Sequence, residues 1–135
     1  LVLVGPRTSR SAPQRAPRVL LAVDGTALPA AGRWIAELPV STTIEVVADI
    51  AGDLGWVEDY LLAEGGRRVP IRPAGPELAD AVAAVGVDAE TFVFAASEAS
   101  RLVGLRRHLR GLGLARDQFA LHGYWKRGHA GPDEA

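Results

Sequence analysis

Short apolar runs alternate along the chain with segments whose apolar residues recur at helical spacing. The runs are bounded by turn-forming residues, which is typical of strands buried on both faces of a sheet. The predicted strands span residues 19–23, 43–48, 68–71, 91–96 and 118–125. The predicted helices span residues 26–38, 76–85 and 98–110, and residues 50–66 are ambiguous between a loop and a short helix.

This alternation predicts the fold class. Strands that alternate with helices are joined by right-handed crossovers and form a parallel sheet with helices on both faces. We therefore predict an α/β fold, a Rossmann-like three-layer domain with a roughly five-stranded parallel sheet. Pro70 in the third strand favours a position at the sheet edge. In such folds ligands bind beyond the carboxyl ends of the strands, so the residues that follow each strand are the candidates for a site.

Composition narrows the class of protein. The chain has 135 residues, of which 48% are hydrophobic, and this suits one compact domain with a core. A net charge of −1 argues against a nucleic-acid partner, and the lack of cysteine excludes disulfides and thiolate ligands. No apolar run reaches the roughly 20 residues of a membrane span, and no signal peptide is recognisable. We expect a cytoplasmic protein without a membrane partner, and the lack of methionine suggests a fragment or a processed chain.

Residues 8–17 are rich in Ser, Pro and Arg and are predicted to form a linker or an exposed loop. The predicted domain then covers residues 19–128, and residues 129–135 form a tail. Its charge is uneven: residues 19–100 hold four basic and thirteen acidic residues, whereas residues 101–129 hold seven basic residues and one acid. Such asymmetry can mark a pole that receives an anion.

The turn after the first strand reads Asp24-Gly25-Thr26-Ala27 and leads directly into a helix. A helix N-terminus offers free N–H groups and a positive dipole end, so this turn is a candidate phosphate site of a dinucleotide. The alternative is an ordinary strand-to-helix cap with Thr26 as the N-cap and Pro29 in the first turn. A single glycine is a weaker signal than a G-x-G-x-x-G motif.

Two further strands end in polar residues. Asp49 follows the second strand, where an acid can accept the 2′-hydroxyl of an adenine ribose and would repel a 2′-phosphate, which favours NADH. The alternative for Asp49 is a solvated loop acid. Ser97 and Glu98 follow the fourth strand and are candidates for contacts with a nicotinamide or flavin ring, or for a helix cap with Ser97 as the N-cap.

The C-terminal third is basic and aromatic. Residues 101–111 form a helix with four arginines, which we interpret as a solvated face, with an anionic ligand as the alternative. Tyr124, Trp125, Lys126 and Arg127 place two aromatic rings beside two cations, which suits a stacking partner and an anion, or else an aromatic plug on the sheet edge. The three histidines are scattered, so we expect no metal site.

Several of these segments resemble one family. The segments "VDGTALPA", "FVFAASEAS", "LRRHLR" and "GYWKRG" are similar, in order and spacing, to motifs in the C-terminal half of the siderophore-interacting proteins. That family consists of flavin-dependent ferric-siderophore reductases of the ferredoxin-reductase superfamily. "LVLVGPRTS" at the start resembles the end of the family's flavin barrel, so residues 1–18 would be the end of that barrel and a linker.

The resemblance implies a function. The chain would be the NAD(P)H-binding domain of a two-domain reductase that passes a hydride from NADH or NADPH to FAD, and the FAD belongs to a preceding domain. The reduced flavin would pass single electrons to a ferric siderophore, and the Fe(II) complex would release its metal. No protein acid or base is required, so no catalytic side chain is expected. Asp24 and Thr26 would belong to the dinucleotide turn and Glu98 to the nicotinamide–flavin contact. Tyr124 and Trp125 would lie at the flavin-domain interface, with Lys126 and Arg127 attracting the anionic siderophore.

The chain departs from the family pattern at its turns. Val23 and Ser97 stand where the family has glycine, Gly25 replaces an acid, and Phe94 replaces a tryptophan. A β-branched residue at position 23 resists positive φ and is expected to narrow the approach of a pyrophosphate, and Ser97 is expected to crowd the nicotinamide. These departures favour an alternative function, a degenerate Rossmann-like docking module that no longer binds dinucleotide.

Overall fold

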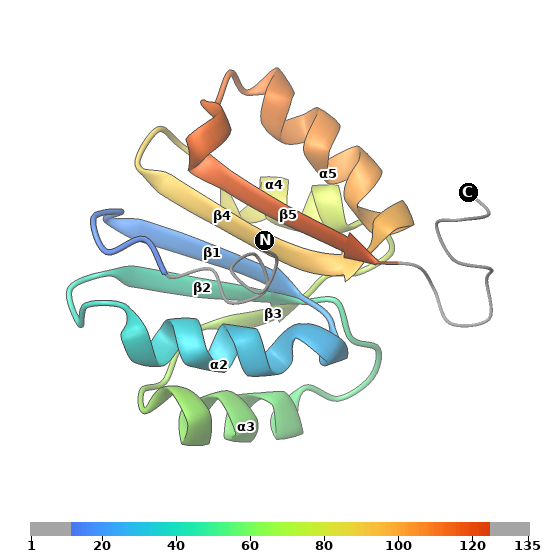
Figure 1. Cartoon of the computed structure of the whole chain (residues 1–135). Coiled ribbons are helices and arrows are strands. Elements are labelled where there is room, and N and C mark those ends of the chain that lie inside the picture. Colours follow the sequence, from blue (N-terminus) through green and yellow to red (C-terminus); the bar gives the residue numbers. More distant parts are fainter. Residues whose placement is uncertain (1–11, 125–135) are drawn as a thin grey trace, which may run out of the picture.

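The protein is a three-layer α/β sandwich, seen in a computed structural model that describes residues 12–124 (Figure 1). Five parallel strands form one sheet in the order β3-β2-β1-β4-β5, which confirms the predicted fold class. The strands are β1 (Arg18–Val23), β2 (Thr43–Ala48), β3 (Ile71–Pro73), β4 (Thr91–Glu98) and β5 (Phe119–Tyr124). The helices are η1 (Gly25–Ala27), α2 (Leu28–Glu37), α3 (Gly55–Gly65), α4 (Leu78–Val85), α5 (Ala99–Gly111) and η2 (Arg116–Gln118).

The sheet has apolar side chains on both faces, as the continuous apolar runs predict. Val19, Leu21 and Val23 of β1 point into the core beneath α2 and α3, whereas Leu20 and Ala22 point into the core beneath α4 and α5. All five are completely buried. The chain order reverses between β1 and β4, so the carboxyl ends of these two strands form the topological switch point at which ligands bind in such folds. No helix within residues 12–124 is long and apolar enough to span a membrane.

Two segments differ from the pattern-based expectation. Residues 50–66, which are ambiguous in the sequence, contain helix α3. The helix ends at Gly65 and is followed by Gly66, whose φ of 79° suits a left-handed cap. The third strand begins at Ile71 rather than at residue 68, because pairing with β2 starts at Val46 opposite Ile71. The loop before β3 packs against the end of α2 instead of pairing with β2. Its Arg67 guanidinium donates hydrogen bonds to the carbonyls of Ile35, Leu38 and Pro39.

Strand β4 is longer than the apolar run suggested. It continues through Ser97 and Glu98, because these residues pair with Gly123 and Tyr124 of β5. Helix α5 therefore begins at Ala99, and Glu98 takes its N-cap position without a side-chain hydrogen bond. The expectation that Ser97 caps this helix is wrong for that reason. The extension also moves the end of β4 beyond the end of β1 at the switch point.

Helices α2 and α3 pack too closely to admit a side chain at Gly65. A Cβ atom built there would lie 2.5 Å from Ile35 Cγ2 and 2.8 Å from Ile35 Cβ. We expect Gly65→Ala to lower the free energy of unfolding by about 1–3 kcal/mol, because the two helices must separate. Gly111→Ala, at a helical position with no atom within 4 Å, is the control and should lose no stability. Urea unfolding measures both, and equal stability of the two variants would contradict the close packing.

Candidate functional site

The turn after β1 is capped by Asp24. Its Oδ1 accepts hydrogen bonds from the N–H groups of Thr26 at 3.0 Å and Ala27 at 3.2 Å, and its own N–H donates to the Ala96 carbonyl of β4. Asp24, not Thr26, is therefore the N-cap of η1, because the aspartate directly precedes Gly25, the first residue of η1, and is extended. Pro29 lies in the first turn of α2 as predicted. The Asp24 carboxylate thus accepts hydrogen bonds from two of the N–H groups at the start of the helix, where the sequence predicts a candidate phosphate site.

The space above the turn is open at Gly25. A Cβ atom built at this residue would meet no atom within 4 Å, so the backbone here can approach a ligand closely. Val23, by contrast, is completely buried and packs into the core beneath α2. Its side chain does not narrow the solvent side of the turn, and the expected obstruction is wrong because strand β1 directs position 23 inward.

Negative charge is concentrated around this turn. Burial raises the pKa of Asp24, and the hydrogen bonds from Ala27 and Thr26 offset this only in part. The neighbouring charges of Asp49 and Glu98 raise it further. A bound pyrophosphate would add to this charge, so the ionisation of Asp24 opposes phosphate binding at the turn.

Asp49 is part of an ion pair rather than a solvated loop acid. Its Oδ1 lies 2.7 Å from Arg101 Nη2, and its Oδ2 lies 3.0 Å from Arg101 Nε and 2.7 Å from the Ser97 hydroxyl, which donates to it. Burial alone would raise the pKa of Asp49, but the hydrogen bonds from Arg101 and Ser97 and the Arg101 charge hold it below its ordinary value. The solvated alternative is wrong because both carboxylate oxygens are engaged.

The residues of this cluster come from three elements. Asp49 follows β2, Ser97 is the penultimate residue of β4, and Arg101 lies in the first turn of α5. The cluster therefore spans the end of β1, which lies between β2 and β4. Ser97 is 1% exposed, so its side chain does not project into an open site. The expectation that it crowds a nicotinamide is therefore wrong. Arg101 also donates to the carbonyls of Gly75 and Pro76 and holds the loop between β3 and α4.

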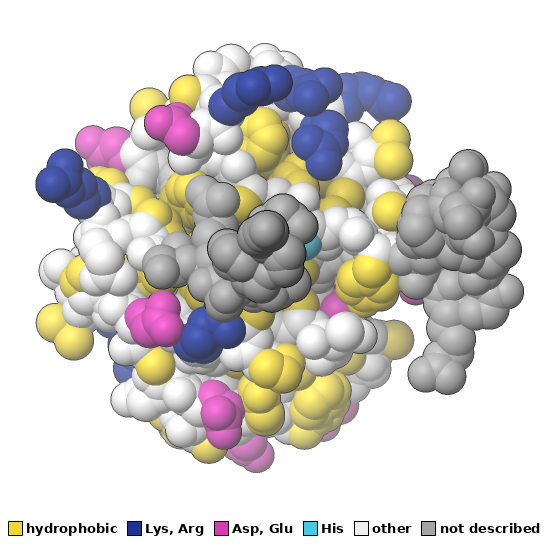
Figure 2. All heavy atoms as spheres, in the orientation of Figure 1, with side chains coloured by type: hydrophobic (Ala, Val, Ile, Leu, Met, Phe, Trp, Pro, Cys, Tyr) yellow, Lys and Arg dark blue, Asp and Glu magenta, His cyan; other side chains and the backbone are white. Residues whose placement is uncertain are grey.

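The sequence analysis missed Arg101 as a site residue because it grouped this arginine with the solvated face of α5. The other three arginines of that segment, Arg106, Arg107 and Arg110, are exposed, as that interpretation predicts. Figure 2 shows dark-blue side chains gathered along the top of the molecule, over α5. The available signal for Arg101 was its place in the first helical turn after β4, at the same sheet edge as Asp49.

A cavity of about 390 Å³ opens on the other side of the carboxyl edge, next to α2. Its aromatic wall is continuous: the Trp34 and Phe94 ring centroids are 4.5 Å apart, and those of Phe94 and His122 are 5.4 Å apart. The cavity brings together candidate residues that are far apart in the sequence, namely Thr26 and Ala27 after β1 and Tyr124 at the end of β5. It is lined by Thr26, Ala27, Ala30, Arg33, Trp34, Phe94, Ala96, His122, Gly123 and Tyr124. Trp125, Lys126 and Arg127 lie outside the described residues.

A second cavity of about 350 Å³ lies beyond the ends of β2 and β3. Asp49 forms one side of it, and Gly52 and Gly75, with φ of 89° and 71°, form turns in its wall. A Cβ atom at either glycine would meet nothing within 4 Å, so the backbone is open to a ligand there too. The carboxyl edge therefore has one cavity beyond β2 and β3, open backbone at Gly25 after β1, and one cavity beside β4 and β5.

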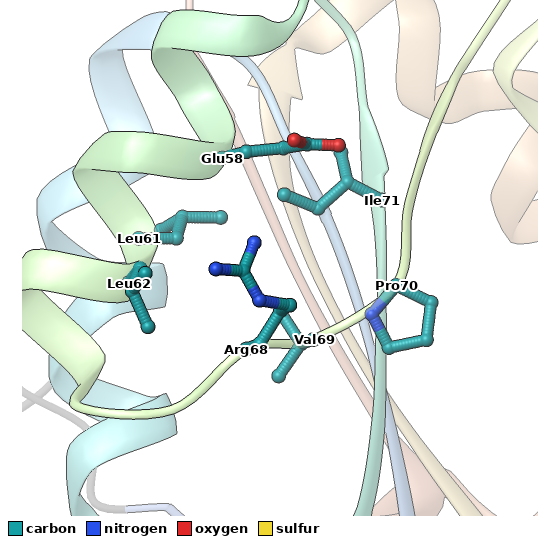
Figure 3. A pocket seen from close by; sticks show the side chains of 7 residues that line it. All are labelled: Glu58, Leu61, Leu62, Arg68, Val69, Pro70 and Ile71. Atoms are coloured by element: carbon teal, nitrogen blue, oxygen red, sulfur yellow. The ribbon is translucent and has the colours of Figure 1, made fainter.

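A larger cavity, of about 520 Å³, lies elsewhere (Figure 3). It is bounded by α3 and by the segment that enters β3, with Glu58 and Arg68 reaching into it from the two sides. Its lining comes from α3 and from the segment that enters β3, not from the carboxyl edge of the sheet, and it includes none of the candidate binding residues named above. We therefore place the candidate site at the carboxyl edge despite the greater volume here.

Fold and site together define a Rossmann-like α/β domain whose polar and aromatic groups gather at the carboxyl ends of β1, β2 and β4. More specifically, the chain belongs to the siderophore-interacting protein family, which it matches over residues 16–128. This confirms the resemblance inferred from the sequence motifs. No curated protein sequence matches the chain.

Solved structures of that family have the same fold. A siderophore utilization protein from T. fusca matches with a TM-score of 0.65 and 30% identity, covering 87% of this chain and 48% of its own. The siderophore-interacting protein SipS from Aeromonas hydrophila gives a TM-score of 0.63 at 19% identity, with 84% and 53% covered. The siderophore-interacting protein from Acinetobacter baumannii gives 0.67 at 18% identity, with 86% and 48% covered. The chain thus spans about half the length of these structures.

Proposed function

We propose that this chain is the NAD(P)H-binding part of a flavin-dependent ferric-siderophore reductase. The observation that carries the proposal is the aromatic cavity, which joins the dinucleotide turn at Thr26 and Ala27 to Tyr124 at the end of β5. These are positions at which the family motifs place the dinucleotide turn and the flavin interface. Family membership and the switch-point position of the turn support the same function.

The residues at the carboxyl edge fit an extended dinucleotide. The cavity outside β2 and β3 suits an adenosine, the open backbone at Gly25 suits a pyrophosphate, and Glu98 lies at the end of β4 where the nicotinamide would meet a flavin. These places follow the strand order β2-β1-β4, so one elongated ligand can occupy all three. When bound, the nicotinamide supplies a hydride to the flavin, which returns two electrons singly to two Fe(III) centres.

The protein's own contribution is binding and orientation. The Gly25 turn and Thr26 hold the centre of the ligand, and the mouth of the aromatic cavity, at His122 and Tyr124, offers a surface to the flavin-bearing partner domain. The attraction of an anionic siderophore by Lys126 and Arg127 stays a prediction, since these residues lie outside the described range. The proposed partners are that flavin domain and an anionic ferric siderophore, in a cytoplasmic protein.

A second candidate function rests on Asp24. Its carboxylate already occupies the Thr26 and Ala27 N–H groups, and two further acids lie near it. On this observation the domain would be a docking module that closes over a flavin domain and binds no dinucleotide. The two candidates differ in one measurable property, the affinity for NADH and NADPH.

Substitution of Asp24 distinguishes them. We expect Asp24→Asn to bind NADH about 3- to 10-fold more tightly than the natural protein, because it keeps the cap while removing one negative charge. The affinity of the natural protein for NADH should rise as the pH falls toward the raised pKa of Asp24, and that of Asp24→Asn should change less. Calorimetric titration measures both, and no binding by either protein favours the docking module.

The redox step is tested in the protein that carries both this chain and a flavin domain. Anaerobic addition of NADPH or NADH should bleach the flavin absorbance, and two equivalents of ferric siderophore should restore it. A flavin that neither nucleotide reduces would overturn the reductase function.

A further inference from the structure

We infer that Arg101 determines which dinucleotide this chain selects, by neutralising Asp49 so that the site accepts the 2′-phosphate of NADPH. The inference rests on the proposed function, since it assigns the specificity of the same site. From the sequence alone, Asp49 favours NADH; this inference reverses that preference in favour of NADPH.

The position of Asp49 is that of a ribose-recognising acid. It follows β2, it comes 25 positions after Asp24, and it lines the cavity proposed for the adenosine. A free carboxylate at this place in a Rossmann-like fold accepts the ribose 2′-hydroxyl and repels a 2′-phosphate. NADH selection by this mechanism requires that the carboxylate be both available and negatively charged.

In this structure the Asp49 carboxylate is ionised, but its charge is compensated by a guanidinium and most of its acceptor sites are taken. Arg101 engages it bidentately through Nε and Nη2, and the Ser97 hydroxyl takes a further lone pair of Oδ2. A carboxylate has about four such acceptor sites, so three are occupied. The guanidinium also balances the charge, and the side chains of Arg101 and Asp49 are only 26% and 13% exposed, which limits screening by solvent.

Arg101 is fixed next to two residues of the adenosine cavity, Asp49 and Gly75, and its side chain is 26% exposed. Its hydrogen bonds to the Gly75 and Pro76 carbonyls tie it to the loop after β3, and Gly75 also lines the adenosine cavity. Four contacts use Nε, Nη1 and Nη2, and a guanidinium has five N–H groups, so one N–H remains for a further acceptor. A 2′-phosphate in this cavity would therefore meet a compensated acid and an oriented cation.

Three variants test the inference through the ratio of the NADPH and NADH affinities, measured by calorimetric titration of the whole chain. Arg101→Gln leaves Asp49 charged and unpaired, so the ratio should fall about 10- to 100-fold in favour of NADH. Asp49→Asn keeps the side-chain size and leaves Arg101 unpaired, so the ratio should rise about 3- to 10-fold. Arg107→Gln, on the exposed face of α5, is the matched control and should leave the ratio unchanged.

The ratio separates specificity from folding, because partial unfolding lowers both affinities equally. Asp49→Asn provides a second test in the opposite direction if Arg101→Gln folds poorly. Binding of both dinucleotides with a ratio that stays within about twofold in Arg101→Gln and Asp49→Asn would overturn this inference and leave the proposed function intact. Failure of the natural chain to bind either dinucleotide would overturn both together.

Discussion

Replacing Trp34 by alanine is expected to lower the free energy of unfolding by about 3–5 kcal/mol. The Trp34 side chain is completely buried between α2 and the sheet, and its ring centroid lies 4.5 Å from that of Phe94 and 5.8 Å from that of Phe92. The substitution removes the apolar burial and both ring contacts, and it leaves a cavity that the sheet cannot close. Urea unfolding followed by far-ultraviolet circular dichroism measures the loss without relying on tryptophan fluorescence.

Trp56 provides the matched control for this substitution. It lies at the start of α3 with 53% of its surface exposed, so Trp56→Ala should change the free energy of unfolding by no more than about 0.5 kcal/mol. Losses of similar size in the two variants would show that Trp34 does not hold α2 against the sheet.

Arg101→Gln is expected to lower the free energy of unfolding by about 2–3 kcal/mol at pH 7, because it leaves the Asp49 carboxylate largely buried without its partner. The pKa of Asp49 is lowered in the folded protein. The stability that the pair contributes is therefore present above the ordinary aspartate pKa of about 4 and is lost as the pH falls through the folded value. The difference between the natural protein and the variant should accordingly shrink below about pH 4.

Two further variants separate the pair from general effects on α5. Arg107→Gln should stay within about 0.5 kcal/mol of the natural protein. The double variant Asp49→Asn with Arg101→Gln should lose less than the sum of the two single losses, since it leaves no unpaired charge. Additive losses, or a loss in Arg101→Gln that is the same at pH 3 and pH 7, would contradict the ion pair.

The fold could be predicted because it depends on local patterns. The apolar runs at residues 19–23 and 91–96 are long enough to define the central strands, and Pro70 correctly indicated an edge strand. Strand β4 was predicted two residues too short because Ser97 and Glu98 are polar. Their strand conformation depends on pairing with Gly123 and Tyr124, which no local pattern specifies.

The candidate site was only partly predictable. The turn at Asp24 is local, so its position was predicted, although the choice between Asp24 and Thr26 as the cap depended on the backbone conformation. The Asp49–Arg101 pair joins residues 52 positions apart, and the sequence alone gives no partner for either charge. The sequence alone does not show whether the Val23 side chain points into the core or toward a ligand. That direction is set by the register of β1 with its neighbours β2 and β4.

The proposed binding of a nicotinamide dinucleotide at the carboxyl edge of this sheet is the step on which the proposed function depends. Its most direct test is a titration of the isotope-labelled chain with NADPH, followed by amide chemical shifts. We expect shifts of the Gly25, Gly52, Gly75 and Glu98 amides, while those of Glu58 and Leu62 at the α3 cavity stay in place. An unchanged spectrum at saturating NADPH, or shifts confined to the α3 cavity, would contradict it.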